Sequence, residues 1–216
     1  RISGKTGVCI VTSGPGATNL LTGIATAYMD SIPLVAFTGQ VPSHLLGRDI
    51  FQEVDITGAA SAFSKHSYLV KDAAELPRII SKSFHIASTG RPGPVLIDVP
   101  IDVQEQVVFD PVFPEEVNIR GYHPSVRGND KQITHVVNAI ATAQRPVICA
   151  GGGVFLSNAL LELETFAART RIPVVTTMMG LSLLPTRPPS EYGDDRDPRQ
   201  RLCQQGIGQV GLADHD

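Results

Sequence analysis

Short apolar runs alternate along the chain with longer segments in which apolar residues recur every three or four positions. The runs 7–12, 33–38 and 95–99 have the length and the β-branched content of buried strands. The segments 17–28 and 76–87 place Ala, Leu and Ile on one face of a helix. Because strands that alternate with helices are typical of parallel sheets, this part of the chain predicts an α/β fold.

The same alternation resumes later in the chain. Residues 133–141 and 159–168 have helical spacing, and 146–150 and 172–176 are short apolar runs. Three consecutive glycines, 151–153, form a turn directly after the first of these runs. We therefore expect a second, Rossmann-like α/β unit.

Two segments show no clear periodicity. Residues 41–65 are expected to be irregular, and residues 100–129 carry Pro111, Pro114 and Pro124, as an interdomain linker on the surface would. The expected organisation is a partial first domain over 1–110, a linker over 111–129 and a partial second domain over 130–186.

Composition excludes several classes of protein. The net charge is −3 and Lys and Arg are scattered, so neither nucleic acid nor a membrane surface is expected as partner. No apolar stretch approaches the roughly 20 residues that span a bilayer. Cys9, Cys149 and Cys203 are too dispersed for a disulfide framework or a zinc site, which favours a reduced, cytoplasmic location. The chain opens with Arg1 and has no signal-peptide pattern, so we interpret it as part of a longer protein.

The string SGPGATN, residues 13–19, lies between a predicted strand and a predicted helix. Glycines let the backbone turn tightly and approach a ligand closely, and the free amides of a helix start favour an anion or a polar group. Asn19 stands where the dinucleotide-binding fingerprint has its third glycine, so that function is not indicated. From spacing alone, the alternative is a tight turn without a ligand.

Longer strings carry a family resemblance. GVCIVTSGPGATNLLTGIATAYMDSIPLVAFTGQVPSHLLGRDIFQEVDI resembles the pyrimidine-binding domain of the acetolactate synthases, which are thiamine-diphosphate enzymes, and ASTGRPGPVLIDVP and NIRGYHPSVRGNDKQI extend the match. RPVICAGGGV and IPVVTTMMG resemble the central domain of the same family. The resemblance runs from Arg1 to about Thr186. Two alternatives stay open: a glyoxylate carboligase, which shares GRPGPVL and AGGGV, and a non-catalytic module of the same fold.

The resemblance implies an activity and its cofactors. The family condenses two pyruvates, or pyruvate and 2-oxobutyrate, with loss of CO2 in branched-chain amino-acid biosynthesis. It uses thiamine diphosphate and Mg²⁺, and it carries FAD without needing flavin redox chemistry. The family also implies a homodimer through the pyrimidine-binding domain and a possible small regulatory subunit.

Site residues are implied in the same way. Phe51 and Gln52 match a catalytic pair that reaches the active site across the dimer interface, where the Gln would hydrogen-bond near the cofactor or the keto acid; a surface loop is the alternative. Positions matched to cofactor or substrate contacts are Gly14, Pro15, Gly16 and Asn19 for thiamine diphosphate, Arg91, Gly151, Gly152 and Gly153 for FAD, and Pro42 and Ile50 for the substrate channel. The three glycines could instead only permit close packing.

Some family features are missing or changed. Ile101 stands where many relatives have Lys, and Lys65 and His66 match a pair to which only a structural role is given. The glutamate that activates the cofactor precedes Arg1 in the family, and Glu53 is no replacement. No glycine-rich acidic Mg²⁺ motif occurs, so no metal site is expected in this chain. The 216 residues alone are therefore expected to be inactive.

Residues 187–216 lose both the apolar periodicity and the resemblance. Removing one base after the Thr186 codon in a possible back-translation yields GMIGIHGNAYAN, which resembles the next flavin-binding segment of the family. We interpret this segment as a frame-shifted tail, with too little apolar content to order.

Overall fold

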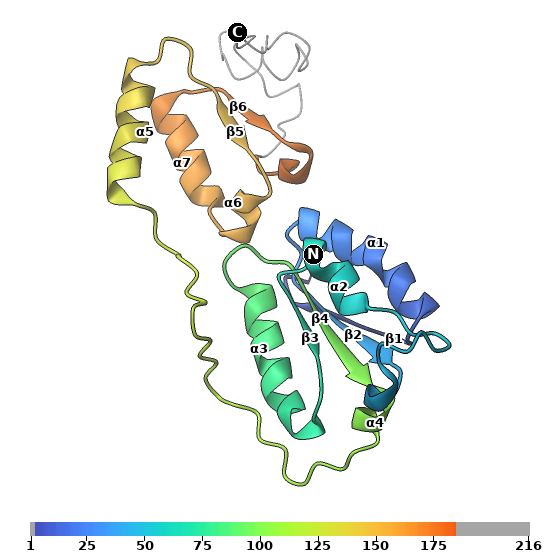
Figure 1. The fold of residues 1–216 in the computed structure, drawn as a ribbon. Coiled ribbons are helices and arrows are strands. Elements are labelled where there is room, and N and C mark those ends of the chain that lie inside the picture. Colours follow the sequence, from blue (N-terminus) through green and yellow to red (C-terminus); the bar gives the residue numbers. More distant parts are fainter. Residues whose placement is uncertain (1–2, 185–216) are drawn as a thin grey trace. The chain divides into compact units, whose positions relative to one another are not determined.

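A computed structural model describes residues 3–184 (Figure 1). The chain divides into two compact units, Arg1–Arg127 and Gly128–Asp216, and each is described by itself. The division falls within the segment expected to be the linker. The segment 187–216, which we interpret as frame-shifted, lies outside the described residues.

The first unit is built on a four-stranded parallel sheet. Its strands are β1 (Gly7–Val11), β2 (Leu34–Gln40), β3 (His66–Leu69) and β4 (Pro94–Pro100), and their order in the sheet is β1-β2-β4-β3. All three pairings are parallel. The expectation of a parallel α/β fold is thus confirmed.

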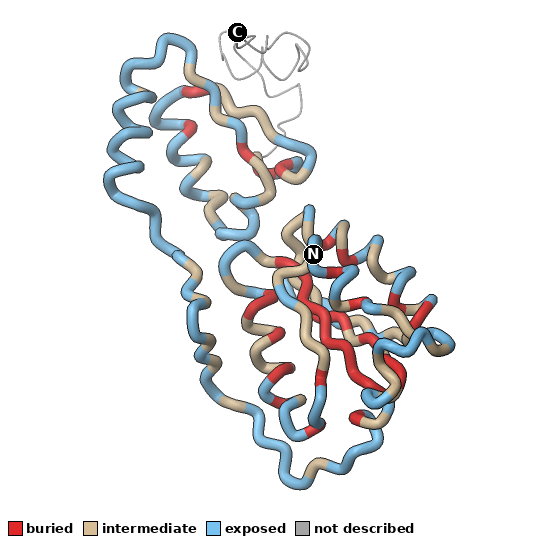
Figure 2. Tube along the Cα trace, viewed as in Figure 1, coloured by how far each residue is buried: buried red, intermediate tan, exposed pale blue. Residues whose placement is uncertain are grey.

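Helices cover both faces of this sheet (Figure 1). The longer ones are α1 (Pro15–Met29) and α3 (Leu76–Ser88). Successive strand residues point to opposite faces. Val35 and Val95 accordingly join a cluster with the α3 residues Ile79 and Ile86. Their neighbours Ala36 and Leu96 join another cluster with α1 and with α2 (Ile56–Ala60). Every residue of β4 is buried between these layers (Figure 2).

Three of the short elements in the first unit were not expected. These are α2, β3 and α4 (Ile101–Gln104). The expectation that 41–65 is wholly irregular was therefore wrong at α2. An element of four or five residues is too short to show a period of its own, and these elements are fixed by packing. Ile56 and Ala60, for example, are fully buried against α1.

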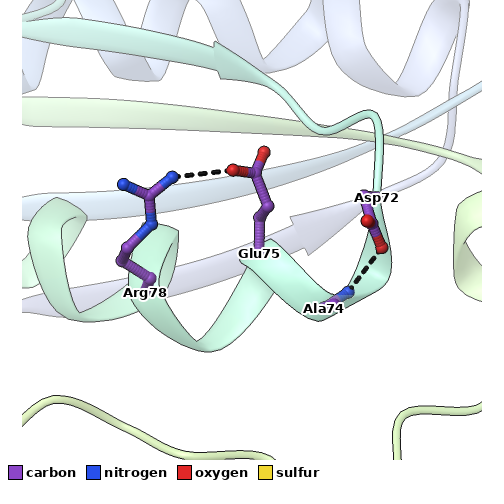
Figure 3. A network of polar contacts seen from close by, with 4 residues as sticks. All are labelled: Asp72, Ala74, Glu75 and Arg78. Carbon is purple, nitrogen blue, oxygen red and sulfur yellow. Dashed lines mark hydrogen bonds and ion pairs between the residues drawn. The ribbon is translucent and has the colours of Figure 1, made fainter.

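The start of α3 shows how local polar contacts set an element boundary (Figure 3). The Asp72 carboxylate accepts a hydrogen bond of 2.9 Å from the amide of Ala74. Glu75 forms an ion pair of 2.7 Å with Arg78 one turn further on. Both partners of the pair are exposed, so the pair adds little to stability. Asp72 caps the 3-10 turn Ala73–Glu75, which leads directly into α3; α3 itself has no side-chain cap and begins with a proline in its first turn.

β1 differs from the buried strand that its apolar run predicts. Within the described sheet it is an edge strand, and Val8 and Ile10 are 52% and 78% exposed. Val8 pairs with Val35, so its side chain lies on the face that α3 covers. Helix α3 packs on β2, β3 and β4. On that face of the sheet, α3 therefore does not cover the side chains of β1.

The segment expected to be a surface linker is anchored to the first unit. Ile119 and Tyr122 pack against the cluster beneath α3. The ammonium of Lys65 donates to the carbonyl of Ile86, to that of Thr89 at 2.6 Å and to the Tyr122 hydroxyl at 3.0 Å. Lys65 thus caps the carboxyl end of α3 and ties the following chain to it.

The second unit contains a smaller parallel sheet of β5 (Ile148–Ala150) and β6 (Val174–Thr176). Its helices are α5 (Asp130–Thr142), α6 (Gly153–Leu156) and α7 (Leu160–Thr170). The Asn129 side chain caps α5 by accepting from the amides of Lys131 and Gln132. Among residues 3–184, no helix is long and apolar enough to cross a membrane.

Candidate functional site

The carboxyl ends of parallel strands form the edge at which α/β proteins commonly bind ligands. β1 leads at this edge into a turn in which Gly14 has φ 57° and ψ −119°. Only glycine adopts that conformation without strain. Helix α1 then begins with Pro15 at its first position, and no side chain caps it. The expectation that the Gly-Pro-Gly turn starts a helix is confirmed.

The turn contacts the Phe51–Gln52 segment. A Cβ atom on Gly14 would lie 2.8 Å from Cβ of Gln52 and 3.0 Å from its backbone oxygen. Gln52 itself has φ 61°. A Cβ on Gly16 would meet the Thr12 methyl group at 2.7 Å. Internal packing therefore accounts for both glycines, and it brings two separately identified sequence segments together.

Several candidate side chains at this edge face solvent. Phe51 is 87% exposed, and Gln52, Pro15 and Asn19 are also exposed. Pro15 and Asn19 are four residues apart on α1 and so lie on the same side of the helix. The side chains exposed on these two segments thus include one aromatic ring and two amides, and the start of α1 adds backbone amides that no side chain caps.

Glu53 organises the loop before Gln52. Its carboxylate accepts hydrogen bonds from the amides of Gly47 and Ile50, the latter at 3.1 Å, and its own amide donates to the Ile50 carbonyl at 3.0 Å. These backbone hydrogen bonds, that of Gly47 first, lower the pKa of Glu53. The ionised carboxylate of Glu53 thus stabilises the loop by binding two of its backbone amides, one of which is that of Ile50.

A second carboxylate fixes the beginning of the same loop. Asp102, on α4, accepts from the Ser43 amide at 2.8 Å and from the Ser43 hydroxyl. These two hydrogen bonds lower the pKa of Asp102. The chain that follows β2 is therefore fixed at Ser43, directly after Pro42. Ile101 lies directly before Asp102 and is 47% exposed at the same edge.

A buried polar cluster lies at the ends of β2 and β4. Asp98 is 1% exposed; its carboxylate accepts from the Thr38 hydroxyl at 2.6 Å and from the Gln40 amide nitrogen at 3.0 Å. Burial raises the pKa of Asp98 to about 6, the two hydrogen bonds oppose that rise, and the charge of Asp55 adds to it. Sequence reasoning missed this cluster, although one acid inside the apolar run VLIDV was a signal for it.

Arg91 lies at the opposite, amino edge of the sheet, because it precedes β4. Its guanidinium Nε donates to the Ser31 hydroxyl at 2.7 Å, and one terminal nitrogen donates to the Met29 carbonyl at 3.1 Å. The arginine thus completes the carboxyl end of α1. The structure does not bring Arg91 to the Gly14–Gln52 contact, and its match to an FAD contact stays a prediction.

The glycine triplet lies in the second unit, at the carboxyl edge of β5. A Cβ on Gly151 would lie 3.3 Å from the Thr177 hydroxyl, and one on Gly152 would lie 3.2 Å from Cβ of Met179. Gly153 has nothing within 4 Å of such an atom. Close packing thus accounts for the first two glycines, whereas the third leaves open space. Within residues 3–184 no group of three or more His, Cys, Asp or Glu could hold a metal ion.

Comparisons with known proteins match a part of each unit. A family model described as the N-terminal TPP binding domain of thiamine pyrophosphate enzymes matches residues 1–59. A model of the central domain of the same enzymes matches residues 133–195. The second match therefore continues past Thr186, into the segment that we interpret as frame-shifted.

Similar proteins carry the name acetolactate synthase. The chain is 51% identical to the acetolactate synthase of Arthrospira platensis over 181 residues. The matched region covers 83% of this chain and 31% of the relative. The chain is 49% identical over 185 residues to the large subunit of Corynebacterium glutamicum, covering 86% and 29%. A probable large subunit of Methanocaldococcus jannaschii is 48% identical over 195 residues, covering 89% and 33%.

The chain spans about a third of the length of these curated relatives. The similarity nevertheless includes most of the present sequence and both of its units. Two matched domains and about 50% identity over more than four fifths of its length place this chain in the thiamine pyrophosphate enzyme family, among proteins similar to acetolactate synthase.

Proposed function

We propose that this chain is part of the catalytic subunit of an acetolactate synthase. In this proposal residues 14–19 and the Phe51–Gln52 pair line one side of thiamine diphosphate. The observation that supports it is the contact between Gly14 and Gln52 at the carboxyl edge of the sheet. Two sequence segments matched to one family site meet there within a single unit.

The residues present fit one side of such a cofactor. Thiamine diphosphate, when bound, supplies the electron sink for decarboxylating a 2-keto acid. The uncapped start of α1 and the Asn19 side chain offer polar contacts for a ring that carries nitrogen atoms. The Gln52 side-chain amide can donate a hydrogen bond to the carboxylate or carbonyl of a keto acid, and Phe51 can exclude water beside it.

The finer parts of the proposal follow the family. The substrates are two pyruvates, or pyruvate and 2-oxobutyrate, and the whole protein is a cytoplasmic homodimer that can associate with a small regulatory subunit. FAD would lie against the turn of Gly151, Gly152 and Gly153, where Gly153 has open space, and against Arg91. Mg²⁺ would be held with the diphosphate by residues outside 3–184. Pro42 and Ile50 would line the access channel.

A replacement experiment tests the proposal. In the Corynebacterium glutamicum enzyme, residues 3–184 of this chain replace the segment that matches them. The two sequences are 49% identical over the matched residues. The hybrid is assayed with thiamine diphosphate, Mg²⁺ and FAD for acetolactate formation from pyruvate. Retained acetolactate formation supports the proposal.

Two other outcomes would favour the alternatives. A folded hybrid that condenses glyoxylate and not pyruvate would favour a glyoxylate carboligase. A folded hybrid that binds thiamine diphosphate without turning over either substrate would favour a non-catalytic module. Thermal unfolding of the hybrid beside the parent enzyme separates these outcomes from simple misfolding.

A further inference from the structure

Gln40 lies beneath the loop that carries Phe51 and Gln52. It is the last residue of β2 and is 6% exposed. Its side-chain oxygen accepts a hydrogen bond of 2.9 Å from the Val41 amide. Its side-chain nitrogen donates to the Val54 carbonyl at 2.8 Å and to Asp98 at 3.0 Å. One buried amide therefore connects the start of the loop, its end and the neighbouring strand.

The amide of Gln40 can satisfy these partners in one orientation only. The Val41 amide can only donate, and the Val54 carbonyl can only accept. Exchanging oxygen and nitrogen would leave both backbone groups facing like partners in a buried place, which is costly. Asp98 adds an acceptor on the nitrogen side, and the Thr38 hydroxyl holds that carboxylate in place. The donors and acceptors of this network therefore fix the orientation of the Gln40 side-chain amide.

The position of Val54 determines that of Gln52. Only Glu53 separates the two residues, and its backbone and carboxylate are both bonded within the loop. Gln52 has a positive φ and contacts Gly14 on its other side. The segment 50–54 is therefore short and folded on itself. At its end, the Val54 carbonyl accepts from the Gln40 side chain and from the Ile56 amide, and Val54 packs against the cluster that contains Ala36 and Leu96.

We propose that Gln40 is a positioning residue, which with Asp98 holds Val54 and thereby presents Gln52 beside Gly14. The proposal deepens the proposed function, since Gln52 is the side chain that would face the cofactor or the keto acid. Gln40 itself is buried and acts through the loop. Preorganisation of this kind matters because small displacements of a positioned group weaken catalysis strongly.

The test measures hydrogen exchange on the full 216-residue chain, without cofactor or substrate. Gln40→Met keeps the length of the side chain and removes both its donor to Val54 and Asp98 and its acceptor for the Val41 amide. The exchange protection of the Gly47, Ile50 and Glu53 amides should fall by about tenfold, as expected for losing a buried hydrogen bond. Protection in β4, at Leu96 and Ile97, should change by less than about twofold. Gln106→Met is the matched control, because Gln106 also bonds a backbone group, the Ala73 amide, away from this loop.

Gln40→Glu supplies a second, pH-dependent readout. When ionised it cannot donate to Val54, and when protonated its hydroxyl can. Burial at this place and the charge of Asp55 favour protonation of a glutamate here, and so does the charge of Asp98 above about pH 6, where that carboxylate is ionised. We compare exchange protection of the loop amides after correction for intrinsic exchange. In Gln40→Glu it should be lost at pH 8 and recover at pH 5. In Gln40→Met it should be low at both pH values. A merely space-filling role would give no such recovery.

Equal loop protection in Gln40→Met and the unchanged chain would overturn the proposal, and so would an equal loss in loop and strands. If Gln40→Met fails to fold, the proposal stands or falls on Gln40→Glu, where protection independent of pH would overturn it. Because no arm uses cofactor or turnover, an inactive hybrid enzyme would refute the proposed function and leave this result intact.

Discussion

Gly14 and Gln52 are packed so closely that a methyl group on Gly14 has no room beside Gln52. Both residues have positive φ, so neither backbone relaxes easily away from the other. The first turn of α1 and the loop after β2 are therefore coupled through one point of contact.

Gly14→Ala should destabilise the chain by about 2–4 kcal/mol, since backbone strain at the new residue adds to the clash with Gln52. Urea unfolding measures the loss. Gly47→Ala is the control, because Gly47 also has a positive φ but nothing within 4 Å of an added Cβ. A loss no larger than that of the control would mean that the contact with Gln52 is easily opened.

Gln52→Ala, made in the hybrid enzyme, should lower kcat/KM for pyruvate by at least about tenfold, as expected for losing one hydrogen bond to substrate or cofactor. Its thermal stability should be unchanged, because the side chain is exposed. Gln106→Ala serves as a control glutamine on the same unit. Equal kinetics for the two variants would remove Gln52 from the site.

Lys65→Met should destabilise the first unit by about 2 kcal/mol. The variant keeps the aliphatic stem and removes the charged donor to the Ile86 and Thr89 carbonyls and to the Tyr122 hydroxyl. Hydrogen exchange should also show weaker protection of the Tyr122 amide, which bonds the Ile119 carbonyl. Lys71→Met, at an exposed position, should change neither quantity; equal effects of the two variants would contradict the cap.

The long elements were predictable from sequence because their periodicity reflects burial. α1 and α3 place an apolar face on the sheet, and β2 and β4 begin with apolar runs, LVAF and PVLI. The Gly14 turn was predictable for a local reason, namely the conformational freedom of glycine before a proline at a helix start. Each of these signals lies within a few neighbouring residues.

The arrangement of the candidate site depends on contacts between segments that are distant in sequence. Nothing near Gln52 indicates that it packs on Gly14, and nothing near Gln40 indicates that Asp98 is its partner. The contacts of Arg91 with Ser31 and Met29 likewise join segments about 60 residues apart. Family resemblance could name residues of one site, but the pairing between them required the fold.

Asp98 should make stability depend on pH in a direction unusual for a carboxylate. Its pKa is raised to about 6 in the folded chain, against about 3.9 when unfolded. Between these values the folded state holds a proton that the unfolded state has lost. The free energy of unfolding contributed by Asp98 therefore falls as the pH rises from 4 to 6, by at most about 3 kcal/mol, and is constant above about pH 7.

Asp98→Asn isolates this contribution, because asparagine keeps the shape and can still accept from Gln40 while donating to Thr38. Urea unfolding at pH 4 to 8 should show the stability of the unchanged chain, minus that of the variant, decreasing up to about pH 6 and then levelling. Glu53→Gln should give the opposite slope, since a lowered pKa stabilises the fold at neutral pH and that stability is lost as the pH falls. A pH-independent difference for Asp98→Asn would mean that Asp98 ionises normally in the fold, and that the strand ends admit water to its carboxylate.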